Sequence, residues 1–266
     1  MSTKKEHAKH LLGATSRIVP AGAWEKLEYT GAYFAGKGSG SNSVKEEVAA
    51  SFRYMTGDKL ILFDLGANKG DWTLEALRVG GVRVKKIYQF EPSAHNIQIL
   101  KKEFGGDDRV ELLPYAASDK SGAAELFSDV PGSGIASLYK RRLDHFNIEF
   151  KAGAPIEMKT VDDVIEKNVI EKVDFMKMDI EGHELSALHG ASSALKNGTI
   201  RALSFEFGGA NIDSRTYFQD FWYLLVPLGY RLFRILPAGS VLPVKNYTEM
   251  LENFRTTNYI AVYKTI

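Results

Sequence analysis

From Leu60 onward, short apolar segments alternate with longer segments in which apolar residues recur at helical spacing. The apolar segments predict strands near residues 60–65, 86–91, 109–113, 173–179, 200–207, 230–235 and 258–264. Helical patterns fill most of the gaps, notably over residues 71–79, 93–104, 182–196 and 214–226. This alternation predicts an α/β fold with a mostly parallel sheet and helices on both faces. The last strand segment has no helix after it, so we expect it to close the sheet as an antiparallel strand.

Two regions depart from this alternation. Residues 1–56 contain short helical patterns broken by Pro20 and Gly31, and we expect a helical extension that caps the main domain, residues 57–266, or covers its site. An insertion near residues 120–160 carries several glycines and prolines among short strand-like segments. Loops at the edge of a sheet often recognise substrates, so we expect this insertion to do so.

The first two predicted strands each end in an acid, and a glycine turn follows the first of them. Asp64 precedes the turn over residues 66–70, and Glu91 ends the next strand. This arrangement is typical of a βαβ unit that binds a nucleoside. The second acid can accept hydrogen bonds from both hydroxyls of the ribose. Dinucleotide-binding folds have a glycine where this chain has Asn68. The pattern therefore favours S-adenosylmethionine (SAM), which has no phosphate and carries an amino-acid tail. A structural turn in another α/β protein is the alternative.

Four predicted strands end in a carboxylate, at Asp64, Glu91, Asp179 and Glu206. Ligands of open α/β sheets bind beyond the carboxyl ends of the strands, so these acids would line one crevice. So much negative charge favours a cationic or hydroxyl-rich ligand, and the SAM sulfonium is a cation.

The segment over residues 175–184 combines a strand end with a helix start. Glu181 and Glu184 are partly explained by the helix dipole, which favours negative charge at a helix N-terminus, and for Glu184 this is the preferred explanation. The same dipole disfavours an imidazolium at His183 and so favours a neutral imidazole that can accept a proton. His183 is therefore a candidate for catalysis, and a surface histidine on the first helical turn is the alternative.

With these segments in place, the chain resembles the FkbM family of SAM-dependent methyltransferases. The matching segments are residues 64–70, 90–92 with Asn96, 116–119, 177–184 with Gly190, and Glu206. The resemblance implies a Rossmann-like class I methyltransferase fold with a seven-stranded sheet. It also implies transfer of a methyl group to a hydroxyl of a sugar, a glycan or a polyketide-type natural product.

The resemblance assigns roles to individual residues. Gly66 and Gly70 would shape the cofactor turn, and Glu91 would hold the ribose. Ser118 and Asp119 would lie near the adenine, while Asp179 would lie beside the methionine part and the transferred methyl. The residues expected to bind the cofactor are Asp64, Gly66, Ala67, Asn68, Gly70, Glu91, Pro92, Ser93, Ser118, Asp119 and Asp179.

A hydroxyl is a weak acid, so methyl transfer to it needs a base that removes the proton. The catalytic candidates are His183, Asp179 and Glu206, with His145 of the insertion as a further base. A pair such as Asp179 and Glu206 could instead hold a divalent cation that acidifies the hydroxyl, but we expect a metal-free base.

Two other functions stay open at this point. A nucleotide-dependent oxidoreductase is opposed by Asn68 in place of the second glycine. A non-catalytic SAM-fold module that scaffolds a biosynthetic complex is opposed by the intact set of cofactor-shaping residues.

Composition limits the partners. The net charge of +1 gives no broad attraction to nucleic acid or to an anionic membrane, so we expect neither as a partner. The sequence contains no cysteine, which excludes disulfides and thiolate metal sites. We find no signal-peptide pattern and no apolar segment of bilayer length, so we expect no membrane insertion and a cytoplasmic location. The expected partner is a small-molecule or glycan hydroxyl acceptor, and a homodimer stays open.

Overall fold

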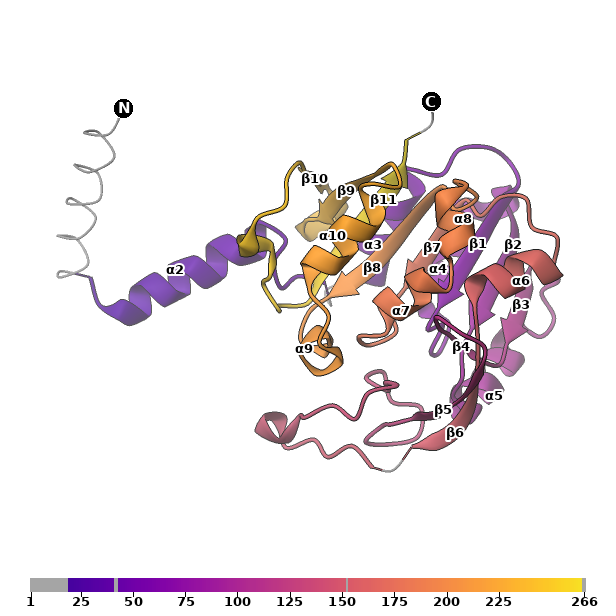
Figure 1. Ribbon diagram of the computed structural model, residues 1–266, viewed down its shortest axis with the longest axis horizontal. Coiled ribbons are helices and arrows are strands. Elements are labelled where there is room, and N and C mark those ends of the chain that lie inside the picture. The colour runs from indigo at the N-terminus through magenta and orange to yellow at the C-terminus, as the bar shows by residue number, and fades with distance from the viewer. Residues whose placement is uncertain (1–18, 41–42, 152, 265–266) are drawn as a thin grey trace.

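The computed structural model describes residues 19–40, 43–151 and 153–264 (Figure 1). Within these residues, eight strands form the main sheet in the order β10–β9–β11–β8–β7–β1–β2–β3. They are β1 (Leu60–Leu65), β2 (Val84–Phe90), β3 (Val110–Leu113), β7 (Phe175–Met178), β8 (Ala202–Phe207), β9 (Tyr230–Ile235), β10 (Val241–Val244) and β11 (Thr257–Tyr263). Neighbouring strands from β3 to β8 pair in parallel, and β11 runs antiparallel to both β8 and β9. The predicted α/β sheet with an antiparallel last strand is therefore confirmed.

The structure adds strands that the sequence pattern did not predict. Strand β10 pairs with β9 at one edge, so the main sheet has eight strands rather than seven. A separate three-stranded sheet lies in and beside the predicted insertion, in the order β4–β6–β5. Its strands are β4 (Ala116–Ala117), β5 (Gly122–Leu126) and β6 (Ala154–Lys159). Many residues of β5 and β6 are exposed, so these strands lack the continuous apolar run that marks a buried strand.

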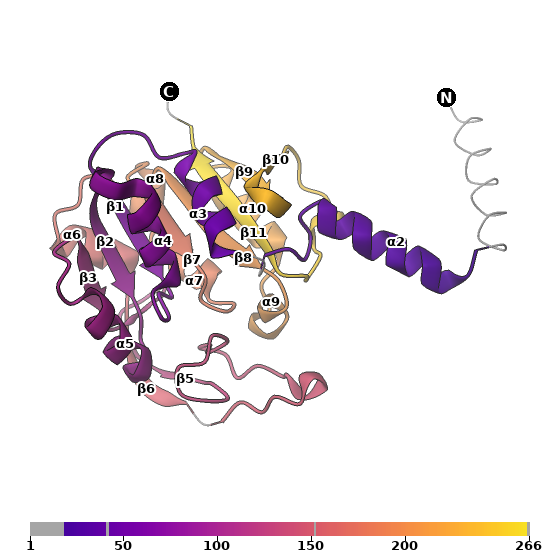
Figure 2. The same cartoon turned by 180° about the vertical axis from the view of Figure 1, so that it is seen from behind.

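Helices cover both faces of the main sheet, as predicted. Helices α6, α7, α8 and α10 lie in front of it in Figure 1, and α3 and α4 lie in front of it in Figure 2. Their bounds, with those of α5 and α9, are α3 (Val44–Phe52), α4 (Asp71–Gly80), α5 (Ala94–Phe104), α6 (Val161–Lys167), α7 (Glu184–His189), α8 (Ser192–Lys196), α9 (Ala210–Ser214) and α10 (Phe218–Leu225). The helix expected over residues 182–196 is instead two short helices separated at Gly190. There the backbone lies so close to Ser118 that an added Cβ would be 1.9 Å from its carbonyl oxygen.

Two apolar clusters hold these helices to the sheet. On one face, Phe205 of β8 stacks on Phe221 of α10 with ring centroids 4.6 Å apart, and Tyr259 of β11 packs beside them. On the other face, Val48 of α3 and Trp72 of α4 are buried against the sheet. Burial of each large apolar side chain contributes roughly 1.5–3 kcal/mol. The edge of the sheet where the strands end is thus anchored from both sides.

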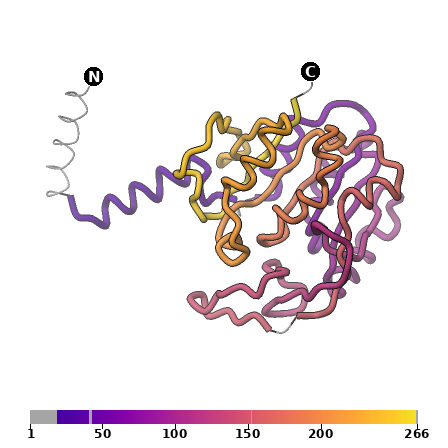
Figure 3. Tube along the Cα trace, viewed as in Figure 1, coloured from indigo at the N-terminus to yellow at the C-terminus, as the bar shows by residue number. Residues whose placement is uncertain are grey.

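The helices before β1 differ in their surroundings. Helix α2 (Ala21–Phe34) has no buried residue and extends away from the sheet (Figures 1 and 3). Helix α3 packs on α4 and contributes to the core. Within the described residues neither helix lines the cavity presented below, and residues 1–18 lie outside them, so a capping role of residues 1–56 stays a prediction. In the described part of the chain, no helix combines the length and apolar character needed to cross a membrane.

Candidate active site

The turn after β1 brings the backbone close to the loop after β7. Gly66 has a φ of 76°, in the left-handed region, and its N–H donates to the Phe90 carbonyl over 2.9 Å. A Cβ at Gly66 would lie 2.1 Å from the carbonyl oxygen of Asp179. Gly70, with a φ of 92°, packs on the ring of Phe104 in α5. Both glycines shape the turn, because a side chain at either position would push apart the segments that meet there.

The Asp64 carboxylate faces a lysine of the chain, whereas we expected it to face a cation of the ligand. It is fully buried, with Oδ1 3.1 Å from Lys177 Nζ and Oδ2 accepting from Thr73 Oγ1 over 2.8 Å. Lys177 Nζ also donates to the Gly66 carbonyl over 2.8 Å. Burial alone would lower the pKa of Lys177, but the neighbouring carboxylates, led by Asp64, raise it above its ordinary value. Through the hydrogen bond of Lys177 to the Gly66 carbonyl, this buried ion pair supports the glycine turn.

The carboxylate of Glu91 is held in place by the glycine turn and by the start of α5. Its Oε2 accepts from the Asn68 N–H over 2.8 Å, and its Oε1 accepts from the Ser93 N–H over 2.9 Å. Asn96, itself buried, donates to Asn68 Oδ1 over 3.2 Å. Burial raises the pKa of Glu91, although these hydrogen bonds oppose the shift. Asn96 Nδ2 also donates to Oε1 over 3.5 Å, so it is Oε2, with a single donor, that keeps a second lone pair for a ligand hydroxyl.

A cavity of about 640 Å³ lies at the carboxyl edge of the sheet. One part of its wall carries the carboxyl side chains of Glu91, Asp179 and Glu181. Apolar side chains, including Phe90 and Leu126, form another part. Strands β2 and β7 flank β1, so the strand order changes direction at β1. Open α/β sheets bind ligands at such a switch point, and the cavity lies there.

Ser118 links His183 to Asp119. Its Oγ donates to Asp119 Oδ1 over 3.0 Å and lies 2.9 Å from His183 Nε2. A carboxylate oxygen only accepts, so the imidazole must donate from Nε2 to Ser118. Burial lowers the pKa of His183 to about 4, and the ring of Tyr139 lies 5.6 Å from the imidazole between centroids. His183 is therefore a neutral ring with Nε2 already engaged.

Glu184 stabilises the loop between β7 and α7 from within. Its Oε1 accepts from the backbone N–H groups of Ile180, over 3.0 Å, and Gly182, over 3.3 Å. The side chain is buried, and burial raises its pKa to about 7. Glu184 thus has a specific partner in the loop, beyond the helix-dipole effect expected from the sequence.

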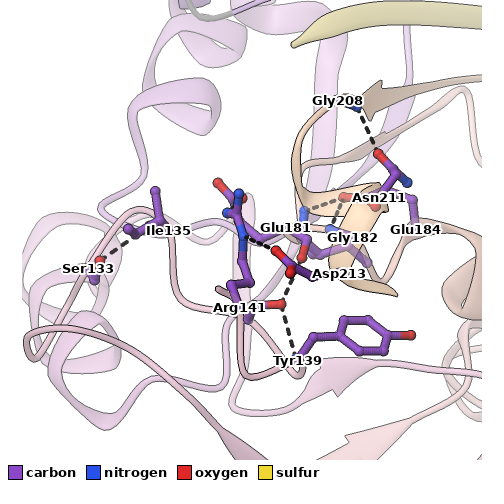
Figure 4. A network of polar contacts seen from close by, with 12 residues as sticks. Ser133, Ile135, Tyr139, Arg141, Glu181, Gly182, Glu184, Gly208, Asn211 and Asp213 are labelled. Carbon is purple, nitrogen blue, oxygen red and sulfur yellow. Dashed lines mark hydrogen bonds and ion pairs between the residues drawn. The ribbon is translucent and has the colours of Figure 1, made fainter. Parts of the chain in front are cut away.

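Arg141 of the insertion joins this loop to α9 (Figure 4). Its guanidinium forms an ion pair with Glu181, and its Nε lies 3.5 Å from Asp213 Oδ2. Ser137 Oγ donates to the backbone carbonyl of Glu181 over 2.7 Å. Burial, reinforced by the charge of Asp179, raises the pKa of Glu181 to about 8, although Arg141 opposes the shift. The insertion is therefore fastened to the carboxyl edge of the sheet by contacts with both the side chain and the backbone of Glu181.

Glu206, at the end of β8, belongs to the same group of acids. Burial, together with the negative charges of Asp179 and Glu181, raises its pKa well above its ordinary value. Glu47 of α3 lies close by, where burial raises its pKa to about 7 and its Oε1 accepts from Ser204 over 3.3 Å. Both acids therefore keep their protons to a higher pH than ordinary glutamates do.

Six of the thirteen expected site residues line the cavity: Gly66, Asn68, Glu91, Pro92, Asp179 and His183. The others do not line it, namely Asp64, Ala67, Gly70, Ser93, Ser118, Asp119 and Glu206. His145 is exposed in η2 (Asp144–Phe146) and, like the latter group, does not line the cavity. Across residues 19–40, 43–151 and 153–264, no three metal-ligating side chains are grouped so as to hold a metal ion.

Sequence reasoning missed three contributors. Asn96 is part of the resemblance but was given no role, although an amide in the first turn of the helix after Glu91 could have suggested one. Glu181 was only partly explained, by the helix dipole. Arg141 lies in an insertion without a recognisable pattern, and its contacts with Glu181 and Asp213 depend on how the insertion folds.

The chain is similar to one protein family and to several solved structures. The family model described as "Methyltransferase FkbM domain" matches residues 64–232. Among solved structures, Methyltransferase FkbM from Methylobacillus flagellatus KT is 20% identical, with a TM-score of 0.48, over 76% of this chain and 44% of that chain. The fibrillarin of Aeropyrum pernix, solved with natively bound S-adenosyl-L-methionine, is 14% identical, with a TM-score of 0.41, over 81% of this chain and 74% of that chain.

Precorrin-6y C5,15-methyltransferase from Geobacter metallireducens GS-15 is 11% identical, with a TM-score of 0.41, over 83% of this chain and 88% of that chain. Among curated proteins none matches the chain. The family model spans more than half of the chain, and it includes the glycine turn, Glu91 and the loop after β7. The resemblance drawn from the motifs is confirmed: this chain belongs to the FkbM methyltransferase family.

Proposed function

We propose that this protein is a SAM-dependent O-methyltransferase that acts on a hydroxyl of a sugar, a glycan or a polyketide-type natural product. The observation that carries the cofactor assignment is the Glu91 carboxylate, which lines the same cavity as Gly66 and Asp179. Backbone N–H groups hold Glu91 in place before a ligand arrives. Such a fixed carboxylate suits the two adjacent hydroxyls of a ribose.

The side chains that line the cavity suit the remaining parts of SAM. Phe90 and Leu126 provide apolar wall for an adenine, and Asp179, with a half-exposed side chain, provides a negative charge for the ammonium or the sulfonium. When bound, SAM supplies an electrophilic methyl group on a positively charged sulfur.

The chain's own residues have two tasks in methyl transfer. They must place the acceptor oxygen about 3 Å from the methyl carbon, since orientation supplies much of the acceleration. They must also take up the hydroxyl proton, a contribution of about 10²–10⁴-fold. The carboxylates at this edge meet the second need, and the insertion around Ser137 and Arg141 lies where it could select the acceptor.

Calorimetric titration with SAM and with S-adenosylhomocysteine tests the cofactor assignment. We expect micromolar dissociation constants for both ligands, and at least tenfold weaker binding in Glu91→Gln. Glu103→Gln makes the same change on the exposed face of α5 and should bind as the parent does. Labelled methyl transfer from SAM to a panel of glycosides and polyhydroxylated natural products then tests the acceptor class. Absence of binding to either ligand would contradict the proposal and favour a scaffold module.

A further inference from the structure

A general base must line the cavity and have an atom that is free to accept a proton. Glu184, Glu206 and His183 each fall short of one of these requirements. Glu184 lies outside the cavity lining, and its Oε1 serves two backbone N–H groups. Glu206 does not line the cavity within the described residues. His183 lines it, and with Nε2 donating to Ser118 its proton-accepting atom is Nδ1, which is buried away from solvent. The pKa of about 4 also makes this imidazole a weak base.

Beyond the ribose-holding Glu91, two acids remain in the cavity wall as proton acceptors, Asp179 and Glu181. Asp179 has a half-exposed side chain, 3.9 Å from Lys177 Nζ. Glu181 is only 15% exposed and lies between the cavity and the insertion. Its shielding from water favours a proton transfer confined to the site.

The backbone of Glu181 is held in an uncommon conformation. Its φ is 53°, in the left-handed region that non-glycine residues rarely adopt. Ser137 fixes its carbonyl, and the following Gly182, with a φ of 97°, packs on the backbone of Ala210. Such conformations cost about 1–3 kcal/mol and cluster at functional sites. Contacts of Ser137 and Ala210 therefore hold the backbone at Glu181 and Gly182 in a conformation that is otherwise unfavourable for a glutamate.

Resting on the SAM-dependent O-methylation proposed above, we propose that Glu181 is the general base and that Arg141 is the residue that positions it. In the reaction, a lone pair of the acceptor oxygen forms the new C–O bond with the methyl carbon. The C–S bond breaks with its electron pair on sulfur, and the hydroxyl proton passes to a carboxylate oxygen of Glu181. The products are a methyl ether, S-adenosylhomocysteine and a protonated Glu181, which then releases its proton to water.

The environment of Glu181 suits this role. Burial and the charge of Asp179 raise its pKa to about 8, so its carboxylate is a stronger base than an ordinary glutamate. The guanidinium of Arg141 keeps a fraction ionised at neutral pH and orients the carboxylate. Because Arg141 belongs to the insertion, the position of the Glu181 carboxylate depends on how the insertion folds.

The test compares Glu181→Gln with Glu166→Gln, the same change on the exposed face of α6, using the acceptor returned by the labelled-methyl screen. We expect Glu181→Gln to lower kcat by about 100-fold or more, with S-adenosylhomocysteine affinity within about twofold of the parent. The parent's kcat should rise with pH toward pH 8, and this rise should vanish in Glu181→Gln. Arg141→Gln should shift the rise to higher pH, and Arg141→Lys should restore part of it.

A Glu181→Gln variant that keeps kcat within fivefold of the parent would overturn the proposal, as would an unchanged pH profile. A second measurement needs no acceptor. Carbon-13 NMR of the glutamate carboxyls should show one signal, absent from Glu181→Gln, that titrates well above the ordinary range; titration near pH 4 would equally overturn the proposal. Failure of the proposed function looks different, since the parent would then bind neither SAM nor S-adenosylhomocysteine.

Discussion

The ammonium of Lys177 and the carboxylate of Asp64 form a buried ion pair beneath the glycine turn, with Nζ 3.1 Å from Oδ1. Lys177→Met should lower the free energy of unfolding by about 3–5 kcal/mol, because it leaves the Asp64 carboxylate buried without its partner. Urea denaturation would measure this loss. In the double variant with Asp64→Asn we expect part of the stability to return, and a double variant as unstable as the sum of both changes would contradict the pairing.

Gly66→Ala should damage both stability and cofactor binding. The left-handed backbone at Gly66 alone should cost about 1–3 kcal/mol with a Cβ present, and the Cβ would also collide with the carbonyl of Asp179. Thermal unfolding and titration with S-adenosylhomocysteine measure the two effects. Gly106→Ala is the matched control, since a Cβ there meets nothing within 4 Å. Equal behaviour of the two variants would refute this account of the turn.

The buried carboxyls make stability depend on pH. Burial raises the pKa of Glu184 from 4.5 to about 7, so between these values the native state retains a proton that the unfolded state has released. The free energy of unfolding should therefore fall as the pH rises from about 5 to 7, by up to about 1.4 kcal/mol per pH unit for each such group.

Glu184→Gln should flatten that fall, while Glu166→Gln should leave it as in the parent. Urea unfolding at a series of pH values measures both slopes. If the stability of the parent instead increases between pH 5 and 7, the native pKa of Glu184 is not raised.

Arg141 should control how tightly the insertion is fastened. Hydrogen bonds to charged groups contribute about 1.5–3 kcal/mol, so Arg141→Ala should speed amide hydrogen exchange across the insertion about tenfold or more. The neighbouring Lys140→Ala removes an exposed lysine and should leave exchange unchanged. Faster exchange in both variants would point to a general loosening of the insertion rather than to the ion pairs of Arg141.

The sequence was sufficient to predict seven of the eight strands described in the main sheet. Strands such as β1 and β8 are continuous apolar runs that end in an acid, so both their presence and the position of Asp64 or Glu206 could be predicted. The turn at Gly66 could be predicted, because a left-handed backbone conformation favours glycine at that position alone and needs no knowledge of distant contacts.

Contacts between distant segments could not be predicted in this way. Asp64 was expected to face the ligand, but it faces Lys177, and only the pairing of β1 with β7 brings the two together. The same holds for Arg141 and Glu181, whose contact depends on the path of an irregular insertion. Strand β10 was missed because it is short and contains a proline.

That proline has a consequence for how molecules of this protein can associate. Strand β10 pairs with β9 on one side and borders the main sheet, and Pro243 in its middle has no N–H to offer a neighbouring strand. A proline in an edge strand is a common protection against sheet-to-sheet extension and aggregation. Strand addition at β10 is therefore a disfavoured way for two copies of this protein to associate.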